Sequence, residues 1–497
     1  MRRALHLVAT ALASAVVAPA LAQQAPLDRR SLPIPEPRPA AITTMDARNA
    51  TPPPRFEVKA PAKAPNVVII LIDDMGFGQP GTFGGPIAMP VLDRIAREGV
   101  RFNRFHTTAL CSPSRMALLT GHNHHANNAG AIMELATGFP GNTGIRPQTI
   151  TPVAEILRQN GYNTAAFGKY HETPPWEASV SGPQDRWPTR SGFEKFYGFI
   201  GGETNQWAPA IFDGSVRVEP PRDPNYHFTT DMTNQAIAWM SAQQALTPDK
   251  PFFIYFAPGA THAPHHVPKD WIARQKGRFD QGWDKLREET FARQKRMGVI
   301  PASAKLTPRP AQIPGWDSFS AKDKAILARQ MEVFAAFGEH TDHEIGRLIT
   351  AIERMGALDN TLVIYIAGDN GASAGGGPEG TANEMMALNA IIQKSSMFAD
   401  QADNWGDPST YPHYAIGWAW AGNTPIQWTK QVASHFGGTR NGLAIRWPTG
   451  FPAQGEIRSQ FHHIIDIAPT ILEAAGIPAP GEVNGIAQRP MDGVSML

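Results

Sequence analysis

The run of apolar and β-branched residues from Asn66 to Ile72 constrains the fold more than any other feature of the sequence. A strand with one exposed face alternates apolar and polar residues. This run has no polar residue after Asn66, so both of its faces must be buried in a sheet. Helical and strand patterns alternate along the rest of the chain, which predicts an α/β fold with a large, mainly parallel sheet flanked by helices. The expected helices are Pro90–Glu98, Ser112–Thr120, Thr230–Gln243 and Ala321–Met355, and the expected strands are Asn163–Phe167, Pro251–Ala257 and Thr361–Ala367.

The N-terminus has the layout of a secretory signal peptide. A basic start at Arg2 and Arg3 precedes an apolar run from Leu5 to Ala18, and a small-residue cleavage sequence ends at Ala22. The alternative, a membrane anchor, requires about 20 apolar residues to span a bilayer, and this run is shorter. We therefore expect residues 1–22 to be removed and the mature protein to be secreted or periplasmic, with no membrane partner.

Proline punctuates the next segment, residues 23–64, where it removes backbone donors and blocks regular elements. This segment is expected to form an extended tether. The remaining residues, 65–497, contain the alternating strand and helix patterns and are expected to form the catalytic part of the chain.

Charge and cysteine content narrow the choice of partners. The chain has 45 basic and 44 acidic residues, so no net field attracts nucleic acid. Its single cysteine, Cys111, cannot form an internal disulfide. A lone thiol in an exported protein is either buried and inert or present for a chemical purpose, and the residues around Cys111 favour the second interpretation.

Two expected strands end in pairs of oxygen-bearing side chains. Asp73 and Asp74 follow the first strand, and Asp369 and Asn370 follow the strand Thr361–Ala367. Ligands of open α/β sheets bind at the carboxyl ends of the strands, and oxygen-only ligands suit a hard cation such as Ca²⁺ or Mg²⁺. The alternative is that these residues only cap turns, which is common for aspartate and asparagine. Their occurrence at two equivalent strand ends favours a metal site.

Cys111 lies in the sequence Cys-Ser-Pro-Ser-Arg, at the start of an expected helix. Pro113 suits the first turn of that helix, so Cys111 would lie near a helix N-terminus, which favours anions. Arg115 follows one turn later on the same face. An unmodified thiol in this position could itself be a nucleophile with a depressed pKa.

Further candidate residues lie in short motifs elsewhere. In Gly168-Lys169-Tyr170-His171, the lysine and the histidine alternate along an extended segment and can point to one side. His262 follows the strand Pro251–Ala257, and Lys430 precedes a glycine-rich segment. Each of these residues, taken singly, is more typical of a structural role than of a catalytic one.

Together these motifs resemble the sulfatase family, a branch of the alkaline phosphatase superfamily. The most specific match is Cys-x-Pro-x-Arg followed by Leu-Thr-Gly, which ends here at Gly121. The Asp-Asp, Gly-Lys-x-His, His-x-Pro and Gly-Asp-Asn-Gly motifs follow in the family's order. The resemblance covers residues 64–497, implies an alkaline-phosphatase-like fold and identifies 65–497 as a sulfatase catalytic domain. The segments 201–205 and 279–284 resemble the long bacterial arylsulfatases.

The resemblance implies a specific chemistry at Cys111. In sulfatases a separate maturation enzyme oxidises this cysteine to formylglycine, whose aldehyde hydrates to a geminal diol. One diol oxygen attacks sulfur, and the other hydroxyl then loses its proton and expels sulfate. The implied activity is hydrolysis of small-molecule sulfate esters, aryl sulfates above all, to an alcohol or phenol and inorganic sulfate.

The resemblance also implies a role for each candidate residue. Asp73, Asp74, Asp369 and Asn370 would hold Ca²⁺, with Mg²⁺ as the alternative ion. Lys169 and Lys430 would neutralise the sulfate, Arg115 would orient the diol, His171 would act as base, and His262 would donate a proton to the leaving alcohol. Lys430 lies seven residues before Gly437, one more than is usual in the family.

Three other readings stay open at this stage. A phosphomonoester or phosphonate hydrolase of the same superfamily uses a similar site, and a thiol-dependent hydrolase would use unmodified Cys111. The chain ends at Leu497, before the small C-terminal sheet subdomain of the family, so a catalytically silent, truncated homologue is the third reading.

Two further groups of residues attract attention for their composition. The aromatic residues between 405 and 420 either stack on an aromatic leaving group or pack in the core. The histidine tracts 122–125 and 340–343 resemble metal motifs, but we expect a pocket or surface loop for the first and a polar helix face for the second.

Overall fold

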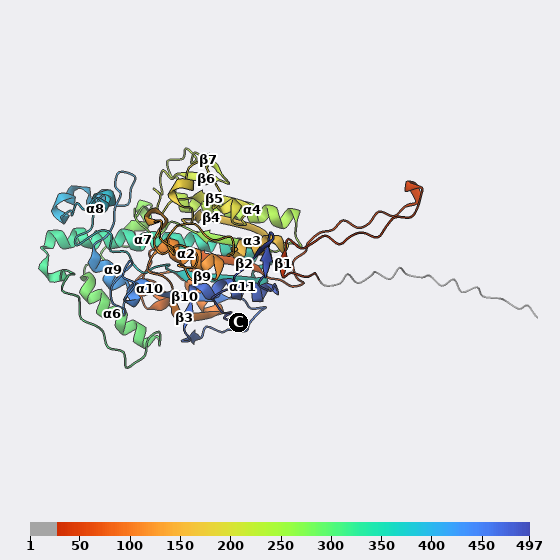
Figure 1. The fold of residues 1–497 in the computed structure, drawn as a ribbon. Helices are drawn as coiled ribbons and strands as arrows, with labels where there is room; N and C mark the ends of the chain where they lie inside the picture. Colours follow the sequence, from red (N-terminus) through yellow and green to blue (C-terminus); the bar gives the residue numbers. More distant parts are fainter. Residues whose placement is uncertain (1–26) are drawn as a thin grey trace, which may run out of the picture.

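The computed structural model describes residues 27–497, so the expected signal peptide and the first residues of the tether lie outside the described residues. A large mixed sheet forms the centre of the molecule (Figure 1). Its strands in spatial order are β11 (Ile457–Arg458), β3 (Val100–His106), β10 (Arg440–Arg446), β9 (Thr361–Ala367), β2 (Asn66–Leu71), β8 (Phe252–Ala257), β4 (Asn163–Lys169), β5 (Lys195–Phe199), β6 (Ile211–Asp213) and β7 (Val216–Val218), with β12 (His462–His463) also paired to β3.

Strand β2 lies in the middle of this sheet and is parallel to both of its neighbours. Ile69 is opposite Tyr255 of β8 on one side and Ile364 of β9 on the other. Strands β4 and β5 continue the parallel arrangement, whereas β10 is antiparallel to both β9 and β3. The predicted α/β fold with a mainly parallel sheet flanked by helices is therefore confirmed.

Helices cover both faces of the sheet because successive residues of β2 point to opposite sides. Val68 and Ile70 contact the core under α1 (Pro90–Glu98), α4 (Phe228–Leu246) and α7 (Ala321–Arg354). Val67 and Ile69 contact the core under α2 (Cys111–Thr120), α3 (Val153–Gln159) and α11 (Ile467–Ala475). The unbroken apolar run of β2 thus fills two cores at once.

The remaining α-helices lie in the connections and toward one end of the molecule. They are α5 (Lys269–Ala273), α6 (Gly282–Arg296), α8 (Glu384–Leu388), α9 (Ile416–Gly422) and α10 (Phe436–Thr439). Trp418 of α9 packs edge-to-face against Trp283 of α6, with ring centroids 5.4 Å apart. Trp405, Tyr414 and Trp420 are also buried, so these aromatic residues pack in the core. Tyr411 alone among them remains partly exposed.

The described part of the proline-rich segment contacts the domain at both ends. Near its start, β1 (Ser31–Leu32) pairs in parallel with β13 (Glu482–Val483), which pairs in turn with β14 (Ile486–Ala487). Leu32 and Ile34 are buried there. Residues 35–55 then run out from the body of the protein and back again (Figure 1). Across residues 27–497, no helix has the length and apolar character that crossing a membrane requires.

Candidate active site

The topology brings several chain segments to one edge of the sheet. Strands β2, β8, β4 and β9 are parallel, so their carboxyl ends lie together. Strand β3 also ends at this edge, because it is antiparallel to β10, which is itself antiparallel to β9. The ends of these strands and the segments that follow them supply every residue that the sequence predicted for the site except Lys430, which reaches the same edge from the segment before β10.

Three buried carboxylates converge at this edge. One oxygen each of Asp73, Asp74 and Asp369 lies within 4.8 Å of the others. Asn370 Nδ2 donates to Asp74 Oδ1 at 2.7 Å, which adds an amide to the group. Asp74 has a φ of 56°, and this left-handed conformation turns the chain at the end of β2. The two predicted pairs of oxygen ligands therefore lie next to each other.

These four residues fit a hard divalent cation. Asp73 Oδ1 and Asn370 Oδ1 are buried and have no hydrogen-bond partner within residues 27–497. Burial, followed by the neighbouring Asp73 carboxylate, raises the pKa of Asp369 to about 8, because buried like charges oppose ionisation. A cation between the oxygens would remove that repulsion and satisfy the two unpaired atoms.

A basic side chain contacts each of the three carboxylates. Lys169 Nζ lies 2.7 Å from Asp73 Oδ2, and Lys430 Nζ lies 2.7 Å from Asp74 Oδ1. Arg115 Nη2 lies 3.0 Å from Asp369 Oδ2. The charges of the three basic side chains therefore balance those of the three carboxylates. If a cation engaged the carboxylates, the basic side chains would be available to bind an anion.

The segment between Lys430 and the glycine pair that begins at Gly437 forms part of a tight loop, which accommodates its extra residue. Trp428 and Gln431 have positive φ angles of 65° and 75°. A Cβ atom on Gly437 would lie 2.1 Å from the carbonyl oxygen of Trp428, so only glycine permits this close approach. Lys430 consequently reaches Asp74 despite the irregular spacing.

Cys111 is the first residue of α2, as the motif predicted, and it is buried. Its Sγ atom lies 3.2 Å from Nδ1 of His171. Burial by itself would raise the pKa of the thiol, but the nearby charges of Lys169, His171 and Lys430 outweigh it and hold the pKa well below its ordinary value. The position therefore favours a negatively charged or strongly polarised nucleophile.

Arg115 lies one turn further along α2 and is also buried. Its Nη1 atom donates to the carbonyl oxygen of Lys169 and to Tyr255 Oη, both at 3.2 Å. These contacts, together with Asp369, fix the guanidinium between the carboxylates and Cys111. Tyr255 belongs to the apolar strand β8, where no sequence motif marked it as part of the site.

The backbone conformation that places His171 in the site differs from the one predicted from the sequence. The expected alternation of Lys169 and His171 along an extended segment is wrong, because β4 ends at Lys169 and His171 has a φ of 57°. Nε2 of His171 lies 2.9 Å from Glu134 Oε2, while Nδ1 faces Cys111. Burial alone would lower the pKa of His171, but the Cys111 and Glu134 contacts raise it.

His262 follows β8 and lies close to Asp74. Its Nδ1 atom is 2.6 Å from the carbonyl oxygen of Ala263, which can only accept, so Nδ1 carries the hydrogen. Nε2 lies 3.5 Å from Asp74 Oδ2. The ring is therefore held so that Nε2 faces the carboxylate cluster.

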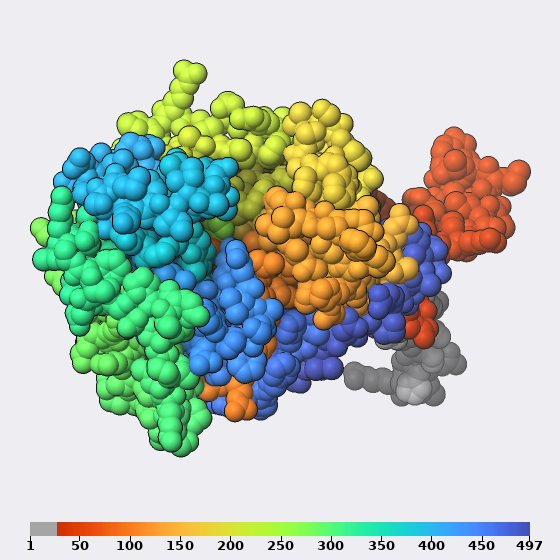
Figure 2. Space-filling view, turned by 60° about the vertical axis from the view of Figure 1, so that its left-hand side comes forward, coloured from red at the N-terminus to blue at the C-terminus, as the bar shows by residue number. Residues whose placement is uncertain are grey.

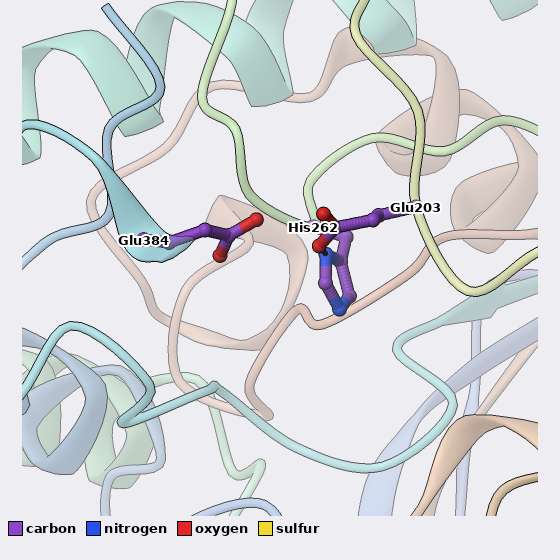
Figure 3. Close-up of side chains that lie close together, drawn as sticks. All are labelled: Glu203, His262 and Glu384. Carbon is purple, nitrogen blue, oxygen red and sulfur yellow. Dashed lines mark ion pairs between the residues drawn. The ribbon is translucent and has the colours of Figure 1, made fainter. Parts of the chain in front are cut away.

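Two glutamates that were not predicted lie beside His262 (Figure 3). Glu203 follows β5, and Glu384 begins α8. One ligand atom of each residue and of His262 lies within 4.8 Å of the others. Glu203 belongs to a segment that had been noted only for its resemblance to bacterial arylsulfatases. Glu384 lies in an irregular stretch where no sequence pattern marks it.

The face that carries these residues is hollowed. Figure 2 shows a recess where the orange, yellow-green, cyan and blue segments of the chain meet. The side chains of Glu203 and His262 are 25% and 17% exposed, whereas Asp73 and Asp369 are fully buried. The site is thus open on the His262 side and closed on the carboxylate side.

The second histidine tract has a structural role. Asp342 accepts from the backbone N–H groups of Val91 and Leu92 and thereby holds the first turn of α1. His340 is buried against the ring of His227. Neither tract contributes to the clusters of potential metal ligands found in residues 27–497.

Comparison with known proteins identifies close sequence relatives. The family model described as Sulfatase matches residues 65–477. An uncharacterized sulfatase of Schizosaccharomyces pombe is 32% identical over 451 residues, covering 86% of this chain and 77% of that protein. An arylsulfatase of Klebsiella aerogenes is 29% identical over 454 residues, covering 88% of this chain and 92% of that protein.

Solved structures share the fold at lower identity. Ps i-CgsB, crystallised with k-i-k-neocarrahexaose, has a TM-score of 0.57 and 20% identity, and the match covers 87% of this chain and 75% of that one. The phosphonate monoester hydrolase of Agrobacterium radiobacter has a TM-score of 0.50 and 18% identity, covering 87% and 76%. The sequence relatives, rather than these structures, identify the family.

Proposed function

Because this chain belongs to the sulfatase family and is a sulfuric ester hydrolase, we propose that it cleaves aryl sulfates through formylglycine at position 111. One observation supports this most strongly. Cys111, the only cysteine, lies at the start of α2 among three basic side chains and three buried carboxylates. A dense group of fixed charges around one nucleophile is what stabilises the charge that develops on a transferring anion.

In this proposal a separate maturation enzyme converts Cys111 to formylglycine. The hydrated aldehyde supplies an oxygen nucleophile for sulfur and a second hydroxyl group that allows sulfate to leave. His171 Nδ1, 3.2 Å from Sγ of Cys111, is in position to accept the proton of that hydroxyl. Arg115 fixes the same region through its contacts with Asp369 and Tyr255.

Asp73, Asp74, Asp369 and Asn370 would hold a divalent cation, Ca²⁺ or Mg²⁺. When bound, such an ion would supply positive charge to polarise a sulfate oxygen. With the carboxylates engaged, Lys169 and Lys430 become available to contact sulfate oxygens. His262, whose Nε2 faces the cluster, would donate a proton to the leaving alcohol.

We also propose that the protein acts outside the cytoplasm. The signal-peptide pattern of residues 1–22 supports this location. An exported enzyme would meet sulfate esters from the surroundings and would depend on the maturation enzyme before or during export.

Mass spectrometry of the tryptic peptide that contains Cys111 tests the nucleophile. In protein from its native host, we expect a loss of about 18 Da relative to cysteine, partly regained by hydration. The intact mass also reports whether residues 1–22 are absent. An unmodified thiol in active protein would contradict the formylglycine mechanism, and hydrolysis of aryl phosphonates in preference to aryl sulfates would contradict the substrate class.

Glu134 provides a second test, because it contacts the base rather than the substrate. In Glu134→Gln the carboxylate no longer stabilises protonated His171, so the pKa of His171 falls. We expect the acidic limb of the pH profile of kcat to move to lower pH and kcat to fall about tenfold, less than the roughly 10²–10⁴ that an intact base contributes. A fall in kcat with an unmoved acidic limb would show that Glu134 is merely structural, and Glu134→Asp should restore part of the shift.

A further inference from the structure

Glu203 and Glu384 form an anionic pair beside His262 that the catalytic proposal does not use. They come from distant parts of the chain, one after β5 and one at the start of α8 (Figure 3). Tyr411 Oη donates to Glu203 Oε1 at 3.3 Å, and the backbone N–H of Glu384 donates to the carbonyl oxygen of Tyr411 at 2.8 Å. These contacts hold both glutamates in the wall of the recess.

One carboxylate oxygen of Glu384 lies buried toward this recess. The residue is only 5% exposed, and its Oε1 atom is buried without a hydrogen bond to any residue of 27–497. Burial, followed by the nearby Glu203 carboxylate, raises the pKa of Glu384 well above its ordinary value. A buried carboxylate that faces another is costly unless a positive group lies between them. The two carboxyl groups can share a proton, and a positively charged group between them would take the place of that proton.

Among residues 27–497, His262 Nδ1 lies 3.9 Å from Glu203 Oε2, and this contact leaves Glu384 Oε1 without a positive partner. Lys430 is already 2.7 Å from Asp74 Oδ1. Nδ1 of His262 donates to Ala263, so this nitrogen has no lone pair for a metal, and Nε2 faces Asp74 instead. The group thus offers no nitrogen ligand for Zn²⁺, and two carboxylates and a phenol are fewer oxygen-bearing side chains than the roughly six to eight oxygen ligands that Ca²⁺ takes. Two carboxylates and a phenol suit an ammonium group, which offers several N–H donors.

The location of the pair indicates where this ammonium group would come from. His262 separates the pair from the carboxylate cluster, and Glu203 is partly exposed to solvent. On the proposed function, His262 faces the leaving alcohol, so the pair lies along the path of the alcohol portion of the ester. Resting on that function, we propose that Glu203 and Glu384 bind a positively charged amino group of the substrate, and that the preferred substrates are amine-bearing sulfate esters.

Matched aryl sulfates test this preference. In the wild-type enzyme we expect kcat/KM for 4-(aminomethyl)phenyl sulfate to exceed that for 4-methylphenyl sulfate by about 10–100-fold, the effect of a charge-assisted hydrogen bond in a partly buried site. In Glu384→Gln and Glu203→Gln this ratio should fall toward one. Ser409→Ala, a change on the exposed loop next to Thr410, serves as the matched control and should keep the ratio.

A binding measurement separates this inference from the proposed function. Calorimetry with the wild-type protein should show tighter binding of 4-(aminomethyl)phenol than of 4-methylphenol, whether or not the protein turns over sulfates. Equal binding of the two phenols, or equal kcat/KM for the two sulfates, would overturn the inference and leave the sulfatase mechanism intact. Binding of a second Zn²⁺ or Mn²⁺ per chain that Glu384→Gln removes would overturn it as well, because the pair would then be a metal site.

Discussion

Cys111→Ala is expected to fold normally and to lose hydrolysis of aryl sulfates by a factor on the order of 10⁴–10⁶, the loss seen when a covalent nucleophile is removed. The side chain is small, and its Sγ atom lies 3.2 Å from Nδ1 of His171. Its removal therefore leaves a cavity of one atom and costs about 1 kcal/mol of stability. Steady-state kinetics and thermal unfolding measure the two effects separately.

Alkylation provides the control for that variant. Iodoacetamide reacts with a thiol and leaves an aldehyde or its hydrate intact, so the mature wild-type enzyme should keep its activity after treatment. Inactivation by iodoacetamide would instead identify a thiol-dependent hydrolase, which the depressed pKa of Cys111 also permits. Cys111→Ala with activity within tenfold of wild type would mean that the nucleophile lies elsewhere.

Most of the fold could be predicted from the sequence, because its strands are short and apolar and are bounded by turn-forming residues. The expected strand Thr361–Ala367 and the expected helix Pro90–Glu98 have the bounds that the structure gives them. The apolar run that begins at Asn66 is enough to show that this strand is buried on both faces. A sheet covered by helices on both sides is the simplest structure that buries a strand in this way. Strand order was out of reach, because it depends on contacts between segments far apart in the chain.

The predicted site residues share one property: each follows or ends a strand, or belongs to a short motif. Residues that follow two parallel, adjacent strands lie at the same edge of the sheet, so the pairing of β2 with β9 brings Asp73 and Asp369 together. Glu134 and Glu384 have no such marker, because they lie in connections whose path is set by packing, and Glu203 follows β5, a strand that was not among those expected from the sequence. The turn at His171 was missed for a related reason, because its left-handed conformation reflects local contacts rather than residue type.

The charge balance of the site connects the metal to the substrate. Lys169 and Lys430 contact Asp73 and Asp74 in place of an ion. A divalent cation adds positive charge to a site that is already balanced, and a sulfate ester brings negative charge that compensates it. Binding of the cation and of the anion should therefore strengthen each other, and by linkage the effect is equal in both directions.

The variant Asp369→Asn tests the contribution of the carboxylates to cation binding separately from their contribution to the stability of the fold. The amide keeps an oxygen for Arg115, which now lies 3.0 Å from the carboxylate, but it removes one of the three charges that attract the cation. In the wild type, Ca²⁺ at a hundredfold excess over its Kd stabilises the protein by about 2.7 kcal/mol. We expect Asp369→Asn to lose this Ca²⁺-dependent rise in Tm and to lose activity by a factor on the order of 10²–10³.

Asp342→Asn is the matched control, because Asp342 is equally buried and burial raises its pKa to about 7. Its carboxylate accepts from the N–H groups of Val91 and Leu92 on α1 and from Tyr365 Oη on β9, and not from the residues of the carboxylate cluster. We expect this variant to unfold at a lower temperature and yet to keep the full Ca²⁺-dependent rise in Tm. If the Ca²⁺-dependent rise in Tm survives in Asp369→Asn, or if Asp342→Asn removes it equally, the strand-end carboxylates do not hold the ion. Replacing Ca²⁺ with Mg²⁺ in the same titration identifies which ion the four side chains prefer.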